Sequence, residues 1–282
     1  MKVLAVVVTY NRCALLERCL NHLEKQIAYP DQLVVIDNGS TDGTAKMLAE
    51  RFVNTISQPN LGSAGGWHRG IECALNEKFD AVWLMDDDGY PAPEALKILK
   101  AAMLPDRACV SSVVVREDEP SLLVFPLRAF GRLQTIEALK KRLPEGVLDA
   151  AHLFNGALVS LSAVRKTGNV TAEYFIYGEE VDFFLRLKKI GKVVSILSAL
   201  HYHPDVNLRP YSKQKVYYYL KNMLIINARY YRWPALRSLV ILVMLLFRIA
   251  NRNGIRTVVA YRTSIFRAVA RGFQGKLGHD FR

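Results

Sequence analysis

The sequence predicts an α/β protein with a mostly parallel sheet and helices on both of its faces. Three observations lead to this fold class. The chain of 282 residues is 51% hydrophobic, which is enough apolar material for a large buried core. Short apolar runs alternate with helical stripes through about the first 90 residues. Each unusual polar loop follows a predicted strand, which is where ligands bind in sheets of this kind.

Strands are predicted from continuous apolar runs, and helices from apolar residues spaced three or four apart. The predicted strands are Val3–Val8, Gln32–Ile36, Asn54–Ser57 and Ala81–Met85. The predicted helices are Cys13–Gln26, Thr44–Phe52 and Gly62–Asn76. Because a helix separates each strand from the next, the strands are expected to run parallel in a Rossmann-like sheet.

Polar loops leave the carboxyl ends of these strands. Asp37, in the second loop, can accept hydrogen bonds from a ribose or a base, and it can equally begin an Asx turn. The third loop places small residues at a helix start, where free N–H groups suit a phosphate; a flexible turn is the alternative. The first loop has neither a dinucleotide-binding glycine pattern nor a phosphate-binding Gly-Lys-Ser/Thr sequence, which argues against those two classes.

Three consecutive carboxylates, Asp86, Asp87 and Asp88, follow the fourth predicted strand. Adjacent anions repel one another, and a divalent cation would relieve that repulsion because hard cations take carboxylate oxygens. The alternative is a helix start, which favours acidic residues and the prolines that follow here.

The net charge of +12 lies almost entirely in the last part of the chain. Residues 205–282 contain 15 Lys and Arg and two Asp, a net charge of +13, whereas residues 1–204 sum to −1. Such an asymmetry points to an anionic partner surface. Nucleic acid is not expected, because no nucleic-acid-binding module accompanies the charge. Four scattered cysteines without paired spacing favour a reducing cytosol.

Four motifs in order resemble the family 2 glycosyltransferases. The motifs are Val7–Arg12, Asp37–Thr44, Asn60–Gly66 and Met85–Asp88. The resemblance covers residues 3–205 and implies a GT-A fold that inverts the anomeric configuration of the transferred sugar. It also implies a catalytic domain of residues 1–205, with a nucleotide-binding half of about 1–90 and an acceptor half of about 91–205.

The resemblance assigns a nucleotide-sugar donor to the first motifs. The residues assigned to it are Thr9, Arg12, Asp37, Asn60, Gly62, Gly65, Gly66, Trp67, Asp86 and Asp87. Asp88 is assigned to a metal ion in a DxD-type element, with Asp86 beside it and facing the nucleotide-sugar.

In metal-dependent relatives a histidine after the strand expected at 193–199 completes the metal shell. His201 is our first choice and His203 our second, with a structural histidine as the alternative. An imidazole ligand favours Mn²⁺ over Mg²⁺, which prefers all-oxygen sites. The metal would neutralise the departing diphosphate as a Lewis acid.

The acceptor half carries a second acidic motif after the glycine-containing strand expected at 154–160. By resemblance, Glu180 stands where the family places the base that takes the acceptor hydroxyl's proton. The family usually has Asp there, so Glu179 and Asp182 are kept as residues that could share the role. The alternative is that all three are simply acids in the first turn of a helix running to Leu187.

Residues 206–282 are predicted to form a basic helical region that associates with a membrane. An aromatic helix is expected at 211–231, followed by an apolar run at 238–247. That run of ten residues covers about 15 Å, so it is not expected to span a bilayer of about 30 Å. The arginines beyond it recur among apolar residues, as in helices that lie in a membrane interface. The alternative is a helix pair packed on the core or on a second subunit, which keeps a homo-oligomer open.

These observations predict a peripheral enzyme on the cytoplasmic face of the inner membrane. It is expected to extend a lipid-linked oligosaccharide for a cell-envelope polysaccharide such as O-antigen. The motifs at 60–67 and 83–88 are similar to those of galactofuranosyltransferases, so UDP-galactofuranose is the first donor and dTDP-rhamnose the second. Two other classes are a nucleotidyltransferase, which would need a glycine-rich first loop, and a non-catalytic glycan-binding homologue, which the intact acids argue against.

Overall fold

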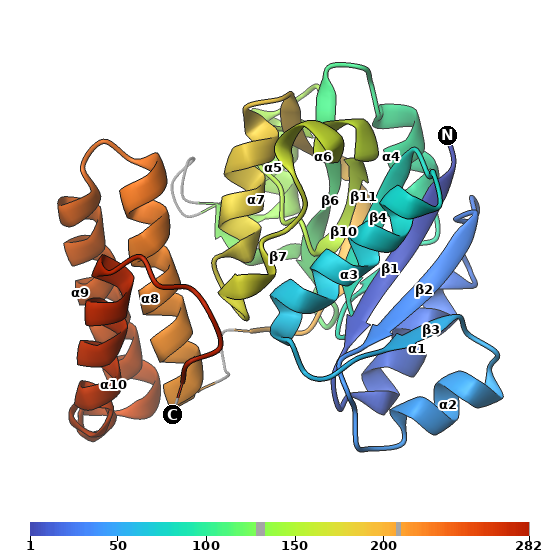
Figure 1. The fold of residues 1–282 in the computed structure, drawn as a ribbon. Coiled ribbons are helices and arrows are strands. Elements are labelled where there is room, and N and C mark those ends of the chain that lie inside the picture. Colours follow the sequence, from blue (N-terminus) through green and yellow to red (C-terminus); the bar gives the residue numbers. More distant parts are fainter. Residues whose placement is uncertain (128–132, 207–209, 282) are drawn as a thin grey trace. The chain divides into compact units, whose positions relative to one another are not determined.

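The computed structural model describes residues 1–127, 133–206 and 210–281 (Figure 1). The chain divides into two compact units. The first unit comprises residues 1–60, 66–169 and 186–205, and the second comprises 61–65, 170–185 and 206–282. Each unit has its own hydrophobic core.

The first unit contains a mixed β-sheet. Its strands are β1 (Val3–Thr9), β2 (Gln32–Asp37), β3 (Thr55–Ser57), β4 (Ala81–Asp86), β5 (Tyr90–Pro91), β6 (Arg107–Arg116), β7 (Leu122–Leu127), β8 (Leu133–Thr135), β9 (Val147–Leu148), β10 (Asn155–Ser160) and β11 (Lys192–His203). The main path of the sheet runs β3-β2-β1-β4-β10-β6-β11-β5. β1 pairs in parallel with both β2 and β4, as the alternating pattern predicts.

Helices flank this sheet. They are α1 (Cys13–Leu23), α2 (Thr44–Glu50), α3 (Gly62–Asn76), α4 (Ala95–Ala102), α5 (Ile136–Arg142) and α6 (Leu161–Thr167). The predicted α/β fold class and the predicted order of elements through β4 are confirmed. Among these elements, the predicted and observed ends differ most at α1, which ends at Leu23 rather than at Gln26. The Gln26 side chain is buried and donates to the Ala92 carbonyl, 2.8 Å away.

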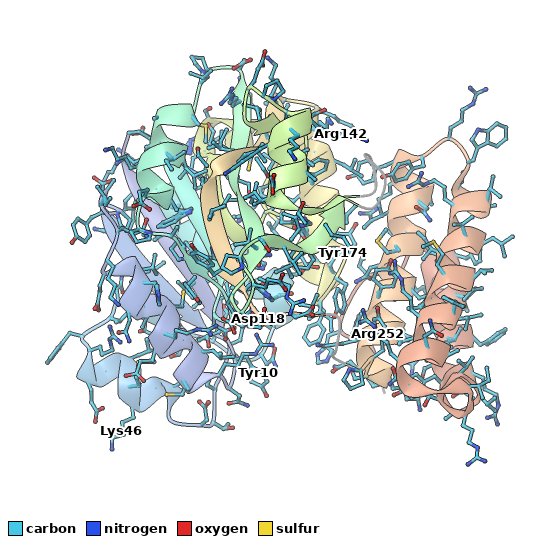
Figure 2. All side chains as sticks on the ribbon, turned by 180° about the vertical axis from the view of Figure 1, so that it is seen from behind. Tyr10, Lys46, Asp118, Arg142, Tyr174 and Arg252 are labelled. Carbon is cyan, nitrogen blue, oxygen red and sulfur yellow. The ribbon has the colours of Figure 1, made fainter. Side chains whose placement is uncertain are left out.

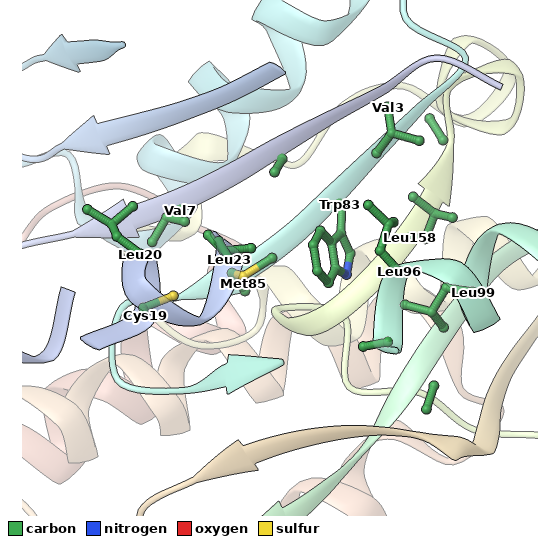
Figure 3. Packing of buried hydrophobic residues seen from close by; sticks show 14 of the residues in the cluster. Val3, Val7, Cys19, Leu20, Leu23, Trp83, Met85, Leu96, Leu99 and Leu158 are labelled. Carbon is green, nitrogen blue, oxygen red and sulfur yellow. The ribbon is translucent and has the colours of Figure 1, made fainter. Parts of the chain in front are cut away.

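Side chains of β1 alternate between the two faces of the sheet, and different helices cover them. Val3, Ala5 and Val7 belong to a core cluster with residues of α1 and α4 (Figure 3). On the opposite face α3 approaches so closely that a Cβ atom on Gly66 would lie 2.5 Å from Val8 Cγ1. Glycines in α3 therefore let the helix lie directly against β1.

The register of the sheet brings the predicted loops to one edge. Thr9 at the end of β1 lies opposite Asp37 at the end of β2, and Val8 lies opposite Asp86 at the end of β4. The loops after these strands therefore leave the sheet side by side, as expected for the carboxyl edge of a parallel sheet.

The second half of the sheet departs from a parallel pattern. β10 lies between β4 and β6 and is antiparallel to both. β11 continues to residue 203 rather than ending near 199, so His201 and His203 lie within a strand instead of after it. Because they are two residues apart in a strand, they project from the same face.

The second unit is mainly helical. It contains the short 3₁₀ helix η1 (Ala172–Tyr174), α8 (Lys213–Tyr230), α9 (Pro234–Asn253) and α10 (Ile255–Phe273), together with the start of α3 and most of α7 (Glu179–Lys188). α9 has 20 residues and an 18-residue stretch of mean hydropathy 1.7, so it is long and apolar enough to cross a membrane by those two criteria. The apolar run 238–247 is thus part of a longer helix, which continues past the arginines at both ends of the run, and its association with a membrane interface stays a prediction.

The close approach of α3 to β1 makes a prediction about stability. A Cβ atom on Gly70 would lie 2.3 Å from Val6 Cγ1, whereas one on Gly43 would lie 3.6 Å from Cys13 Sγ, an ordinary contact. Gly70→Ala should lower the free energy of unfolding by about 1–2 kcal/mol, because overpacking outweighs the gain in helix propensity. Gly43→Ala should change it by less than about 0.5 kcal/mol. Urea denaturation compares the two; equal stabilities would mean that Val6 moves aside easily.

Candidate active site

The acidic triplet follows the buried strand β4. Asp86 is half-buried, and its N–H donates to the Phe154 carbonyl at 2.9 Å, while Asp87 and Asp88 are 3% and 4% exposed. Buried carboxylates are unfavourable unless nearby groups compensate their charge. The hydrogen-bond and ion-pair partners of Asp87 and Asp88 therefore indicate which ligands the site can bind.

Asp87 ties the loop after β1 to the loop after β4. One of its oxygens accepts from Thr9 Oγ1 at 2.7 Å, and the other accepts from the Arg12 guanidinium at 2.9 Å. Burial raises the pKa of Asp87, and the charge of Arg12 opposes that rise. Thr9 and Arg12, both predicted to line a nucleotide pocket, are thus brought together with the triplet.

Asp88 lies between Arg12 and His203. Its Oδ2 accepts from Arg12 at 2.9 Å, and its Oδ1 lies 3.1 Å from His203 Nε2. The other ring nitrogen, Nδ1, lies 2.7 Å from the Pro204 carbonyl and must donate its hydrogen there, because a carbonyl only accepts. In the neutral ring, the Nε2 lone pair then faces a carboxylate oxygen, an arrangement that a cation between them would stabilise.

This donor set fits a divalent metal ion in part. A carboxylate and an imidazole whose other nitrogen donates to a carbonyl are usual ligands for Mn²⁺. Among the described residues, however, no group of three His, Cys, Asp or Glu side chains converges as a metal site. Any further ligands would therefore have to come from substrate or water, as is common for metals bound with phosphates.

His201 is placed differently from His203. Its ring is fully buried, and neither ring nitrogen has a hydrogen-bond partner among the residues that the structure describes. A Cβ atom on Gly89 would lie 2.3 Å from Nε2, and one on Gly156 would lie 2.8 Å from Nδ1. Burial lowers the pKa of His201 to about 3, so the ring is neutral. The geometry therefore favours His203, which reaches Asp88, over His201, which is packed between two glycine backbones; a metal-binding role for either stays a prediction.

Asp37 begins a turn, which is one of the two roles that the sequence suggests for this residue. Its Oδ1 accepts from the N–H and the hydroxyl of Ser40, at 2.9 and 2.6 Å. The side chain is 2% exposed, and the Asn38 N–H donates to the Thr9 carbonyl beside it. A role for Asp37 in binding a ribose or a base stays a prediction.

The glycine-rich start of α3 also has defined partners. Gly62 adopts a left-handed backbone with φ of +73°, and the Ala64 N–H donates to the Phe175 carbonyl at 3.0 Å. One of the N–H groups expected for a phosphate is thus already paired. Gly65 packs against Leu61, and Asn60 is exposed just before the helix.

Trp67 does not line an open surface. Its indole is fully buried and stacks on Phe154, with ring centroids 4.4 Å apart and an interplanar angle of 6°. Contact with a nucleotide-sugar would need this ring to move, and the assignment of Trp67 to the donor stays a prediction. Nothing in the sequence distinguished a buried tryptophan from one that stacks on a ligand.

The second acidic motif begins α7. Glu179 is 5% exposed; its Oε1 accepts from Ser63 Oγ at 2.7 Å, and its Oε2 has no hydrogen-bond partner among the described residues. Burial raises the pKa of Glu179 to about 7. Asp182 accepts from Tyr230 at 2.6 Å and from Tyr174, labelled in Figure 2, at 3.3 Å. Glu180, the predicted base, is half-buried.

The loop before this motif depends on a residue that the sequence did not reveal. Asn222 in α8 donates to three backbone carbonyls of the loop, those of Tyr174, Ile176 and Tyr177, at 2.7–3.0 Å. An asparagine inside an aromatic helix carries no motif, so only the three-dimensional structure identifies this function.

Comparison with known proteins agrees with the geometry. Residues 4–161 match the family model described as glycosyl transferase family 2. The galactofuranosyltransferase GlfT1 of Mycolicibacterium smegmatis is 35% identical over 213 residues, which cover 72% of this chain and 70% of that protein. The N-acetylglucosaminyl-diphospho-decaprenol L-rhamnosyltransferase of Mycobacterium tuberculosis is 29% identical, over 66% of this chain and 70% of that protein.

A solved structure shows the same fold. The mannosyltransferase PcManGT of Pyrobaculum calidifontis, in complex with GDP-Man and Mn²⁺, aligns with a TM-score of 0.57 and 19% identity over 97% of this chain and 79% of that one. The α/β architecture is thus that of the GT-A glycosyltransferases. From the matched domain and the similarity to GlfT1, the chain belongs to glycosyl transferase family 2 and is a glycosyltransferase.

Proposed function

We propose that this enzyme transfers galactofuranose from UDP-galactofuranose to a lipid-linked glycan, with inversion and with a divalent metal ion. The observation that carries this proposal is the cluster of Asp88, His203 and Arg12 at the carboxyl edge of the sheet. The choice of sugar is supported by the 35% identity to a galactofuranosyltransferase. dTDP-rhamnose is the second candidate donor, supported by the similarity to a rhamnosyltransferase.

Asp88 and His203 would hold the metal ion, with Asp86 as a further ligand. Mn²⁺ is favoured over Mg²⁺ because of the imidazole, and the similar fold in PcManGT was solved with Mn²⁺. When bound, the metal would neutralise negative charge on the departing diphosphate. Arg12 already brings positive charge to Asp87 and Asp88 and would also lie beside that diphosphate.

Glu180 would be the base that takes the proton from the acceptor hydroxyl. Glu179 accepts from Ser63, and Asp182 accepts from Tyr174 and Tyr230. A hydroxyl deprotonated by Glu180 would attack the anomeric carbon from the side opposite the diphosphate, which inverts the configuration. Binding and orienting the acceptor is therefore the function that we assign to the second unit.

A membrane surface would present the lipid-linked acceptor. α9 exposes apolar side chains at a helical spacing along one face: Leu236, Leu239, Val240, Val243 and Phe247. α10 exposes Ile255, Val259, Phe266 and Phe273 in the same way, with arginines between them. These side chains are not packed on the core. Exposed apolar residues beside cations suit the interface of an anionic membrane, on the cytoplasmic face where nucleotide-sugars are present.

The proposed reaction is tested with a panel of nucleotide-sugars, Mn²⁺ and a lipid-linked glycan acceptor. UDP release from UDP-galactofuranose should depend on Mn²⁺ and rise when the acceptor is added. Glu180→Gln should lower transfer by about 100-fold or more while leaving the Kd for UDP unchanged, because general-base catalysis is lost. Glu180→Asp serves as the matched control and should keep part of the activity.

Three results would each contradict one part of this proposal. Full transfer by Glu180→Gln would remove the base assignment. Release of pyrophosphate instead of a nucleoside diphosphate would indicate a nucleotidyltransferase. Preferential use of dTDP-rhamnose would keep the mechanism and replace the donor.

The two histidines should differ in metal binding. His203→Gln should weaken Mn²⁺ binding in the presence of UDP by about 10-fold or more, because it removes a direct ligand. His201→Gln should leave Mn²⁺ affinity close to that of the wild type in the fraction that folds. Electron paramagnetic resonance of free Mn²⁺ measures both affinities, and the reverse order would restore His201 as the ligand.

The membrane role should depend on the exposed face of α9. Replacing Leu239, Val243 and Phe247 together by Ser should weaken binding to vesicles that contain anionic phospholipid by about 100-fold or more, because each apolar side chain contributes about 1.5–3 kcal/mol when buried. Phe52→Ser, at a side chain 94% exposed in the first unit, is the control. Cosedimentation with vesicles measures binding. Unchanged binding, or loss of a dimer in light scattering instead, would show that the face has another partner.

A further inference from the structure

We propose that the segment Gly278–Phe281, here called the strap, positions the loop Tyr174–Gly178 and through it Glu180. The inference rests on the proposed function, because it concerns the base assigned there. His279 and Asp280 are then positioning residues for the transfer of sugar to the acceptor, although the sequence places them about 100 residues away from Glu180.

The loop that the strap contacts is strained. Phe175 has φ of +66° and ψ of −71°, and the Ile176 N–H donates to the Tyr174 carbonyl at 2.9 Å, which together form a γ-turn of the rare kind. Tyr177 has φ of +60°, again in the left-handed region. Such conformations cost about 1–3 kcal/mol each and persist only when surrounding groups hold them. The loop therefore needs contacts from outside itself.

One set of contacts comes from α3 and α8. Asn222 donates to three of the loop carbonyls, and the Ala64 N–H donates to the Phe175 carbonyl. Gly62 packs so closely that a Cβ atom there would lie 2.0 Å from the Phe175 oxygen. These contacts fix the carbonyl groups of the loop, and Gly62 also packs on one edge of the Phe175 ring, where a Cβ atom would lie 2.7 Å from Cδ2.

The strap supplies the other set of contacts. The Gly278 N–H donates to the Glu173 carbonyl at 2.8 Å. The His279 ring stacks on the Phe175 ring, with centroids 3.9 Å apart and an interplanar angle of 7°. Phe175 also contacts Tyr218 of α8, at 5.0 Å between ring centroids. The strap and α8 thus hold the one ring at the centre of the γ-turn.

The strap is itself anchored on the helices. Lys221 of α8 is fully buried, and its Nζ donates to Asp280 Oδ1 and to the Gly278 carbonyl, both at 2.8 Å. Arg267 of α10 donates to the Asp280 carbonyl at 2.6 Å, and the Phe281 N–H donates to the Tyr218 hydroxyl at 3.2 Å. A buried ammonium needs its partners, so these contacts hold the strap firmly in place.

The loop leads straight into α7, where the acidic motif begins. Gly178, with φ of +93°, would bring a Cβ atom within 2.9 Å of Asn222, so the chain has little freedom at this point. Glu180 is two residues further along. A shift of the loop would therefore move its carboxylate, and transfer depends steeply on the placement of a general base.

Two measurements test the strap, and one of them does not involve activity. His279→Ala should speed hydrogen–deuterium exchange in peptides that cover residues 173–178. It should also lower kcat/KM for the acceptor by about tenfold, the equivalent of one aromatic stacking contact, with the Kd for UDP unchanged. His279→Phe keeps a flat ring and should restore both values. Lys276→Ala, at an exposed residue just outside the strap, is the matched control.

A second variant, Asp280→Asn, keeps the shape of the side chain and removes the charge that pairs with Lys221; it should affect exchange and acceptor kinetics in the same direction. Wild-type exchange and wild-type acceptor kinetics in His279→Ala would overturn the proposal. An equal loss of donor binding and transfer would overturn it as well, because that would indicate general unfolding. If the wild-type enzyme uses no donor in the panel, the proposed function fails, while hydrogen exchange still decides whether the strap holds the loop.

Discussion

The carboxylates at the end of β4 must have their negative charge compensated, and the structure of the first unit at this edge depends on that requirement. Asp87 and Asp88 are buried, and a buried carboxylate without compensation would be unfavourable by several kcal/mol. Thr9 and Arg12 supply that compensation from the loop after β1. The same contacts join two loops that leave neighbouring strands, so the balancing of charge also shapes the edge of the sheet. The residues that stabilise the fold there are the residues expected to meet the diphosphate.

The second unit meets a different constraint, which is backbone strain rather than charge. Its loop before α7 contains two non-glycine residues in the left-handed region, and neutral donors such as Asn222 hold it. In each unit, groups far apart in the sequence keep an unfavourable local arrangement in place. Such arrangements are concentrated where enzymes need fixed geometry.

The sequence was most informative where local patterns determine structure. The strands β1 to β4 were found because continuous apolar runs and intervening helical stripes depend only on nearby residues. The insertion of β10 between β4 and β6 could not be foreseen, since antiparallel pairing across the sheet is a long-range choice. The same limit applies to the two histidines. Both were expected after a strand, and only the structure shows that the backbone at Gly89 and Gly156 packs on the His201 ring while the His203 ring reaches Asp88.

For the acidic residues of α7, too, the sequence predicts some features and only the structure shows others. Their presence at the start of α7 was evident from the sequence, and the different partners of Glu179 and Asp182 were not. The sequence shows which acidic side chains are present, whereas their hydrogen-bond partners come from segments that are distant along the chain. Ser63 and Tyr230, for example, lie 116 and 48 residues from the acids that they contact.

The burial of Lys221 links the folding of the second unit to the direction of protein synthesis. The ribosome makes α8 before Asp280, which follows Lys221 by 59 residues. Until Asp280 has emerged, the ammonium group lacks its carboxylate, and an apolar interior cannot close around an unpaired cation. The helices can form earlier, but their packing around Lys221 must wait. The loop Tyr174–Gly178 therefore gains its contacts with the strap only after residues 278–281 have emerged.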